Sequence, residues 1–134
     1  MPIYMDVVPL DRLVVIVARG RVSAEEIAEN TRKLVEANVP GYAKIIDVIG
    51  STSNLTREQV NGMAAMLRSG RDVAARGPVA FVVDPARSGF ADSFAEATEG
   101  DRPVRLFRSL HDARRWSKEN LPGSAGRAGD HRPR

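Results

Sequence analysis

The chain has 134 residues, of which 43% are hydrophobic, and it contains no cysteine. This composition fits one globular domain with a substantial core, and it excludes disulfides, thiol catalysis and thiolate metal sites. The sequence pI is about 9.8. Residues 121–134 contribute three arginines and one acid, which leaves 17 basic and 16 acidic residues in 1–120. A nucleic-acid-binding module carries its positive charge on the fold, so this distribution argues against direct nucleic-acid binding.

The beginning of the chain lacks the basic and the long apolar regions of a signal peptide. No apolar run approaches the roughly 20 residues that are needed to cross a bilayer. The sequence therefore predicts a cytoplasmic protein without a membrane span.

Two apolar, β-branched runs open the chain, Ile3–Val8 and Leu13–Ala18, with a short turn between them. They predict an antiparallel hairpin. Ser23 followed by Glu26 forms a capping box, in which the hydroxyl accepts a bond from a free helix N–H and the carboxylate accepts one from the cap's own amide. Apolar residues then recur at helical spacing, which predicts a helix over about 23–38.

A second capping box follows the third strand. This strand is predicted over 43–48, with its polar end near Asp47, and Thr56 with Gln59 repeats the capping spacing. An apolar stripe predicts a helix from there to about Arg76. The free N–H groups at the start of this helix offer a seat for an anion, a phosphate or a partner's carboxylate.

The second half of the chain continues the alternation of strands and helices. Short apolar strands are predicted over 79–83 and 104–107. Between them, Asp84 starts a helix or a turn leading into one, and a last helix follows a cap at Ser109. The residues expected to face inward from these two helical segments are Phe90, Phe94, Ala97, Leu110, Ala113 and Trp116.

Strands that alternate with helices after a hairpin predict an α/β fold with a mostly parallel, five-stranded sheet. The strands are apolar at odd and even positions, so both faces of the sheet need cover. We expect the helices mainly on one face, which would leave the other for a partner and favour a homodimer. A single domain is predicted over 1–120, followed by a disordered basic tail over 121–134 that is rich in Gly and Pro.

This order of elements resembles the STAS domain of anti-sigma factor antagonists over about residues 4–120. Three segments are similar to that family: the strand end at Asp47, the Asp84–Ala86 loop, and Phe107–Leu110 with Ala113. The resemblance implies a β-α superhelix with strands in sequential order. It also implies that a partner kinase phosphorylates a Ser or Thr at the start of the helix after the third strand.

The family's acceptor position falls at or near Thr56, with Ser53 and Ser51 as alternatives. Family members that switch carry Asp-Ser-Ser-Gly there, whereas this chain has Asn-Leu-Thr-Arg at residues 54–57. The resemblance implies a non-enzymatic, regulatory protein-interaction module that binds a kinase, an anti-sigma-like protein or another regulator. The expected partner-binding residues are Asp47, Asn54, Thr56, Arg57 and Gln59.

Two alternatives stay open. The same superhelix resembles the CRAL-TRIO domain, which implies a small-molecule-binding or lipid-binding protein. Asp47 and Asp84 both end parallel strands, where paired carboxylates can hold a metal or act as acid and base, although bonds to loop amides are the plainer interpretation.

His111 and His131 are separated and lack cysteine partners for a zinc site, and no glycine-rich phosphate loop is present. We therefore predict no catalytic residue, no metal site and no cofactor.

Overall fold

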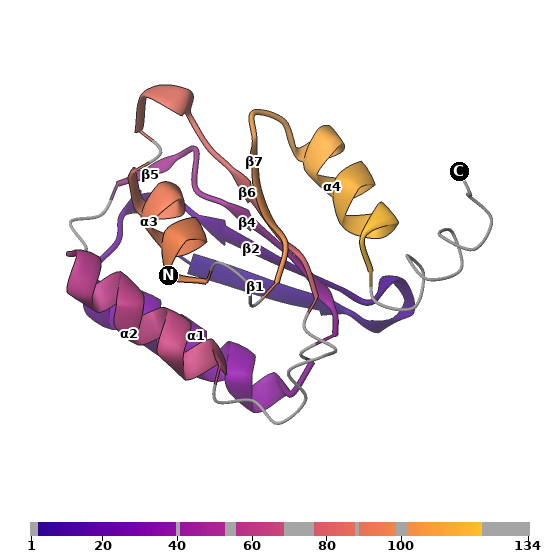
Figure 1. Cartoon of the computed structure of the whole chain (residues 1–134), viewed down its shortest axis with the longest axis horizontal. Helices are drawn as coiled ribbons and strands as arrows, with labels where there is room; N and C mark the ends of the chain where they lie inside the picture. Colours follow the sequence, from indigo (N-terminus) through magenta and orange to yellow (C-terminus); the bar gives the residue numbers. More distant parts are fainter. Residues whose placement is uncertain are drawn as a thin grey trace.

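The computed structural model describes residues 3–39, 41–52, 56–68, 77–87, 89–98 and 102–121. Its strands, helices and short 3₁₀ turns (η) follow one another along the chain as labelled in Figure 1. In order they are β1 (Ile3–Val8), η1 (Pro9–Asp11), β2 (Leu13–Ala18), β3 (Gly20–Arg21), α1 (Ala24–Ala37), β4 (Ala43–Asp47), β5 (Ser51–Thr52), α2 (Arg57–Arg68), β6 (Val79–Val82), η3 (Pro85–Arg87), α3 (Gly89–Ala97), β7 (Val104–Phe107) and α4 (Leu110–Glu119).

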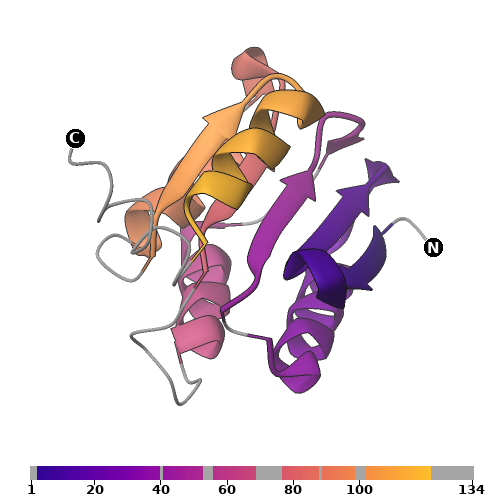
Figure 2. The same cartoon turned by 90° about the vertical axis from the view of Figure 1, so that its right-hand side faces the viewer.

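The main sheet has five strands in the order β1-β2-β4-β6-β7. β1 pairs with β2 antiparallel, and each later pairing in this sheet is parallel. The order of these strands therefore follows the sequence, as Figures 1 and 2 show. The predicted α/β class, the N-terminal hairpin and the sequential superhelix are confirmed.

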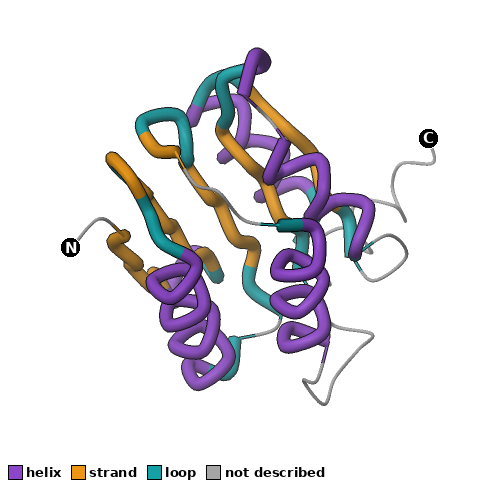
Figure 3. Tube along the Cα trace, turned by 90° about the vertical axis from the view of Figure 1, so that its left-hand side faces the viewer, coloured by secondary structure: helices purple, strands orange, loops and turns teal. Residues whose placement is uncertain are grey.

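Helices cover both faces of the sheet. Figure 2 shows α4 in front of the strands, and Figure 3, from the opposite side, shows α1 and α2 in front of them. Alternation along the strands sets this division: Leu13 and Val15 pack in the α4 cluster, whereas Val14 and Ile16 pack with Leu34 of α1. The helices α1, α2 and α3 thus lie on one face, as predicted, and α4 covers part of the other. The homodimer stays a prediction.

Two aromatic pairs mark the two core layers. On the α1–α3 side the rings of Phe81 and Phe94 meet edge to face, with their centroids 5.3 Å apart. On the α4 side the rings of Phe107 and Trp116 lie 5.6 Å apart. Phe94 and Trp116 therefore face the sheet, as the apolar spacing of their helices predicts.

Local signals placed the helix starts accurately. The Ser23 Oγ accepts from the Glu26 N–H at 3.1 Å, and the Glu26 carboxylate accepts from the Ser23 N–H at 2.8 Å, so α1 begins with the predicted capping box. The Asp112 N–H donates to the Ser109 Oγ at 3.1 Å, which caps α4. The predicted end of the second helix at about Arg76 and the side chain of Phe90 lie outside the described residues.

Two features differ from the sequence-based expectation. The sequence predicts no strand between Asp47 and Thr56, but Ser51–Thr52 forms β5 and pairs in parallel with Gly20–Arg21 as a small second sheet. Leu121, the first residue of the predicted tail, is 6% exposed and packs in the α4 cluster. The packed region thus reaches Leu121, and residues 122–134 lie outside the described residues.

Candidate functional site

Thr56 is exposed and N-caps α2. Its hydroxyl oxygen accepts from the Gln59 N–H at 3.1 Å, and the Gln59 side chain accepts from the Thr56 N–H at 2.9 Å, so the second capping box is confirmed. Arg57 forms an exposed ion pair with Glu96 of α3, with 2.6 Å between Nη1 and Oε1. Three of the expected partner-binding residues therefore have local structural roles at one helix end, and they remain accessible to solvent.

Asp47 and Ser51 are the other predicted site residues that the structure describes, and each makes a local bond in the loop after β4. Asp47 follows Ala43 and Ile45 in alternation, which puts it on the face of the sheet that α4 covers. Its carboxylate accepts from the Ile49 N–H at 3.2 Å. The Ser51 hydroxyl donates to the Val48 carbonyl at 3.0 Å, a local turn bond. Ser53 and Asn54 lie outside the described residues.

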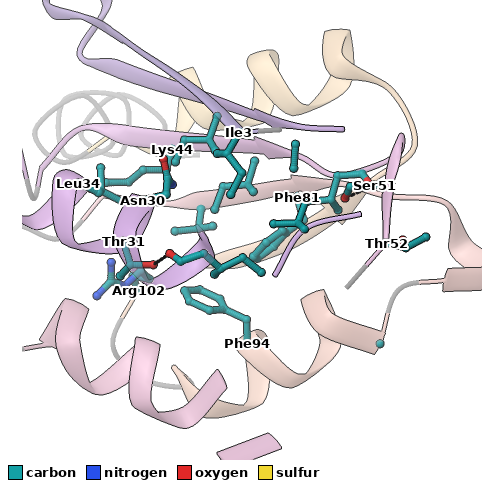
Figure 4. A pocket seen from close by; sticks show the side chains of 18 residues that line it. Ile3, Asn30, Thr31, Leu34, Lys44, Ser51, Thr52, Phe81, Phe94 and Arg102 are labelled. Carbon is teal, nitrogen blue, oxygen red and sulfur yellow. Dashed lines mark hydrogen bonds between the residues drawn. The ribbon is translucent and has the colours of Figure 1, made fainter. Parts of the chain in front are cut away.

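A cavity of about 390 Å³ lies between the sheet and the helices on the α1–α3 side. Figure 4 shows the side chains that surround it. Most of them are apolar and come from β2, β4, β6, α1 and α3. The apolar walls include Ile16, Ala18, Val22, Ile27, Leu34, Ile46, Val48, Val79, Phe81 and Phe94.

Two cations also line this cavity, Lys44 and Arg102. Lys44 is only 3% exposed, because it lies on β4 between Val14 of β2 and Val79 of β6. Its ammonium donates to the Val39 carbonyl at 3.1 Å, just beyond the C-terminal end of α1. Arg102 precedes β7, and its Nε and one terminal nitrogen are shielded from solvent.

The polar groups of the cavity gather at two ends. In Figure 4, Lys44 and Arg102 lie at the same end as Asn30 and Thr31, whereas Ser51 and Thr52 lie at the other. The topology explains this division, because Lys44 and Arg102 belong to the start of parallel strands and Ser51 lies beyond the end of β4. The cavity thus runs along the strand direction, from an end with two cations to an end with two hydroxyls.

Burial and charge together perturb Lys44. Removal of its ammonium from water and, second, repulsion from Arg102 lower the pKa of Lys44 from 10.5 to about 7. Among the lining residues that the structure describes, none is Asp or Glu.

One solved structure has a similar fold. The chain is similar to an uncharacterised protein of the DUF3478 family from Shewanella loihica PV-4, whose fold is described as SpoIIAA-like. The TM-score is 0.58 at 16% identity, and the match covers 86% of this chain and 91% of that one. The fold is STAS-like. No family model matches the sequence, and no curated protein matches it significantly.

The two aspartates at the strand ends of this STAS-like domain accept hydrogen bonds from backbone N–H groups of the loops that follow them. The Asp84 carboxylate accepts from the Ala86 N–H at 3.0 Å, much as Asp47 accepts from Ile49. In the described ranges, no three His, Asp or Glu side chains gather as a metal site requires. Within the same ranges, no helix has the length and apolar character to cross a membrane.

Sequence reasoning missed the two cations of the cavity. For Lys44 a signal existed: it is a charged residue between the apolar residues Ala43 and Ile45 of β4, and alternation puts it on the same face as Ile46. For Arg102 we find no such signal, because the residue precedes its strand and reaches the cavity only through the tertiary fold.

Proposed function

We propose that this STAS-like domain is a non-enzymatic binding protein whose cavity holds a small apolar or amphipathic molecule. The observation that carries the proposal is the cavity itself, which has a volume of about 390 Å³ and is lined by strands and helices. Ligand pockets typically measure about 300–1,000 Å³ and have mostly apolar walls with a few polar groups. The proposal corresponds to the ligand-binding alternative that the sequence leaves open.

The cavity volume sets the size of the molecule. One non-hydrogen group, such as a methylene, takes about 30 Å³, which is the volume of one water molecule in the liquid. About 390 Å³ therefore accommodates about a dozen such groups. A medium-chain alkyl compound such as decanol has this size, whereas a membrane phospholipid is several times larger.

Calorimetric titration with decanol tests the proposal, with a variant that fills the cavity. Ala18→Leu adds side-chain volume to the cavity wall on β2 and should abolish saturable binding. Val15→Leu is the matched control, because it adds a leucine to the opposite face of the same strand. Absence of saturable heat with the wild-type domain, or equal binding by wild type and Ala18→Leu, would remove the proposal.

A second candidate function is docking of a regulatory protein, a kinase or an anti-sigma-like partner, at the start of α2. The exposed Thr56 hydroxyl favours it. A phosphate on this side chain would face the positive end of the helix dipole, which contributes about 0.3–1 kcal/mol. The test compares capture of host proteins by wild type, Thr56→Glu and Thr56→Ala, followed by mass spectrometry of phosphosites. Identical capture by all three would count against regulation at Thr56.

A further inference from the structure

The strand β1 forms one border of the main sheet, and within the described ranges it pairs with β2 alone. All six of its residues pair in uninterrupted register with β2, from Ile3 opposite Ala18 to Val8 opposite Leu13. The backbone groups that do not bond to β2 therefore point outward along the whole strand. Figure 2 shows this border in indigo, on the side of the N-terminus.

β1 lacks several features that protect the borders of sheets. Proteins protect a border with bulges, with proline or lysine in the strand, or with a short strand. Ile3–Val8 pairs without a bulge and contains neither proline nor lysine. The strand β7, at the other border, has only four residues and carries Arg105. The border at β1 is therefore the better place for the addition of a strand.

A groove of about 510 Å³ lies beside this border, between β1 and α1. Ile3 lines it on the side of β1, and one stripe of α1 lines the other side. Figure 3 shows α1 over this part of the sheet. Because side chains alternate along a strand, an extended peptide beside β1 would place every second side chain on the groove side.

We propose that β1 binds an extended peptide with basic side chains, which adds a strand to the sheet beside the groove. Addition of a peptide strand to the border of a sheet is a recurring mode of recognition, in which the backbone bonds give affinity and the side-chain contacts give specificity. This inference is separate from the cavity ligand, because it uses the border of the sheet and the outer surface of α1.

The groove carries more negative than positive charge. Glu25, Glu26 and Glu29 line it together with one cation, Lys33. Glu26 belongs to the capping box of α1, and Glu29 pairs with an arginine of the same helix. Glu25 is exposed, and it forms no hydrogen bond or ion pair within the part of the chain that the structure describes. Glu25 is therefore the carboxylate that we expect to contact a basic side chain of the peptide.

The other face of β1 has a charge of the same sign. Met5 and Val7 pack toward α1, so alternation puts Asp6 on the opposite face, where it is exposed. Opposite charges on facing residues stabilise a pair of strands, and like charges destabilise it. A basic peptide is thus favoured on both faces, and an acidic one is disfavoured. A second copy of this chain would bring its own Asp6 and the glutamates of its α1 to the same border, so it fits less well than a basic peptide.

Fluorescence anisotropy with three labelled hexapeptides, capped at both ends, tests this inference. The first alternates threonine with lysine, and the second alternates threonine with glutamate. The third repeats the lysine peptide with every backbone nitrogen methylated, which removes the N–H donors and keeps the charges. We expect the lysine peptide to bind at least about tenfold more tightly than either of the others, because only it offers both the charges and the backbone donors.

Amide hydrogen exchange, measured residue by residue, locates the bound peptide. The lysine peptide should slow exchange at alternate amides of Ile3–Val8, those that point away from β2. Exchange in Val104–Phe107 of β7, the other border, should stay unchanged.

A pair of variants tests the role of the groove. Glu25→Lys should weaken binding of the lysine peptide about tenfold or more, because it replaces an attraction by a repulsion. Glu119→Lys is the matched control, since Glu119 is exposed at the end of α4 and the change in net charge is the same. It should leave binding of the lysine peptide within about twofold.

Preference for the lysine peptide, with slower exchange confined to β1, supports the inference. Equal binding of the lysine and glutamate peptides overturns it, and so does an equal loss with Glu25→Lys and Glu119→Lys. Binding without slower exchange in β1 overturns it as well, because the peptide would then lie elsewhere. A domain that is dimeric without peptide and already protected at β1 would mean that a second copy occupies the border. That result, or failure of all three peptides to bind, also overturns the inference, and neither bears on decanol binding in the cavity.

Discussion

The buried ammonium of Lys44 should make the stability of this domain depend on pH. Lys44 is 3% exposed, and burial beside Arg102 lowers its pKa to about 7 from 10.5. At a pH between these two pKa values, Lys44 carries a proton in the unfolded chain but not in the folded chain. The free energy of unfolding therefore rises as pH increases from about 7 to 10.5, and the destabilisation is fully present below about 7.

The magnitude follows from the two pKa values of Lys44. At about 1.4 kcal/mol per pH unit, the interval corresponds to a maximal destabilisation of about 5 kcal/mol. Between pH 7 and about pH 9 the free energy of unfolding should rise by about 2 kcal/mol. Lys44→Met has a similar volume without the charge, so it should remove this rise and stabilise the domain at pH 7.

Urea denaturation at a series of pH values measures this effect, as the difference between wild type and Lys44→Met at each pH. Lys118→Met is the control, because Lys118 is exposed near the end of α4. Its pH profile should match that of wild type. Parallel profiles for wild type and Lys44→Met, or a Lys44→Met protein that is less stable at pH 7, would refute the reasoning.

Four further predictions concern packing and caps, each measured by urea denaturation at constant pH. Gly77→Ala should destabilise by about 2 kcal/mol or more, since its Cβ would lie 2.2 Å from the Tyr42 carbonyl oxygen. Gly62→Ala, within α2 and with nothing within 4 Å, should instead stabilise by about 1 kcal/mol. Ser117→Ala should stabilise by about 1 kcal/mol, because the Ser117 hydroxyl is buried without a hydrogen-bond partner in the described part of the chain. Thr56→Ala should cost about 1 kcal/mol through loss of the α2 cap.

The sequence predicted what depends on neighbouring residues. In both capping boxes and in the cap at Ser109 the bonded residues lie three positions apart, so their spacing in the sequence alone identifies them. The sequential strand order was implied by the resemblance to the STAS domain, and the order of the main sheet confirms it. The short pairing of Gly20–Arg21 with Ser51–Thr52 was missed, since two-residue strands leave no periodic pattern.

The candidate site was harder to predict, because it depends on which face each side chain occupies. Alternation from Ile45 puts the Asp47 side chain on the α4 face of the sheet, and this placement can be derived from the strand pattern. The cavity cannot, because it exists only where α1, α3 and three strands fail to fill the space between them. A volume of this kind depends on the packing of residues that are distant in sequence.

The structure allows two roles for Lys44, and they predict opposite results for one variant. As a structural residue, Lys44 would tie β4 to the carbonyl of Val39, where the end of α1 also favours a cation. Lys44→Met would then destabilise the domain at every pH. As a residue of the cavity wall, Lys44 lowers the stability of the empty domain, and Lys44→Met would gain stability. A loss of stability of this kind is common at binding sites. The pKa of about 7 favours the second role, because a net stabilising tie to the Val39 carbonyl would favour the charged ammonium and raise that pKa.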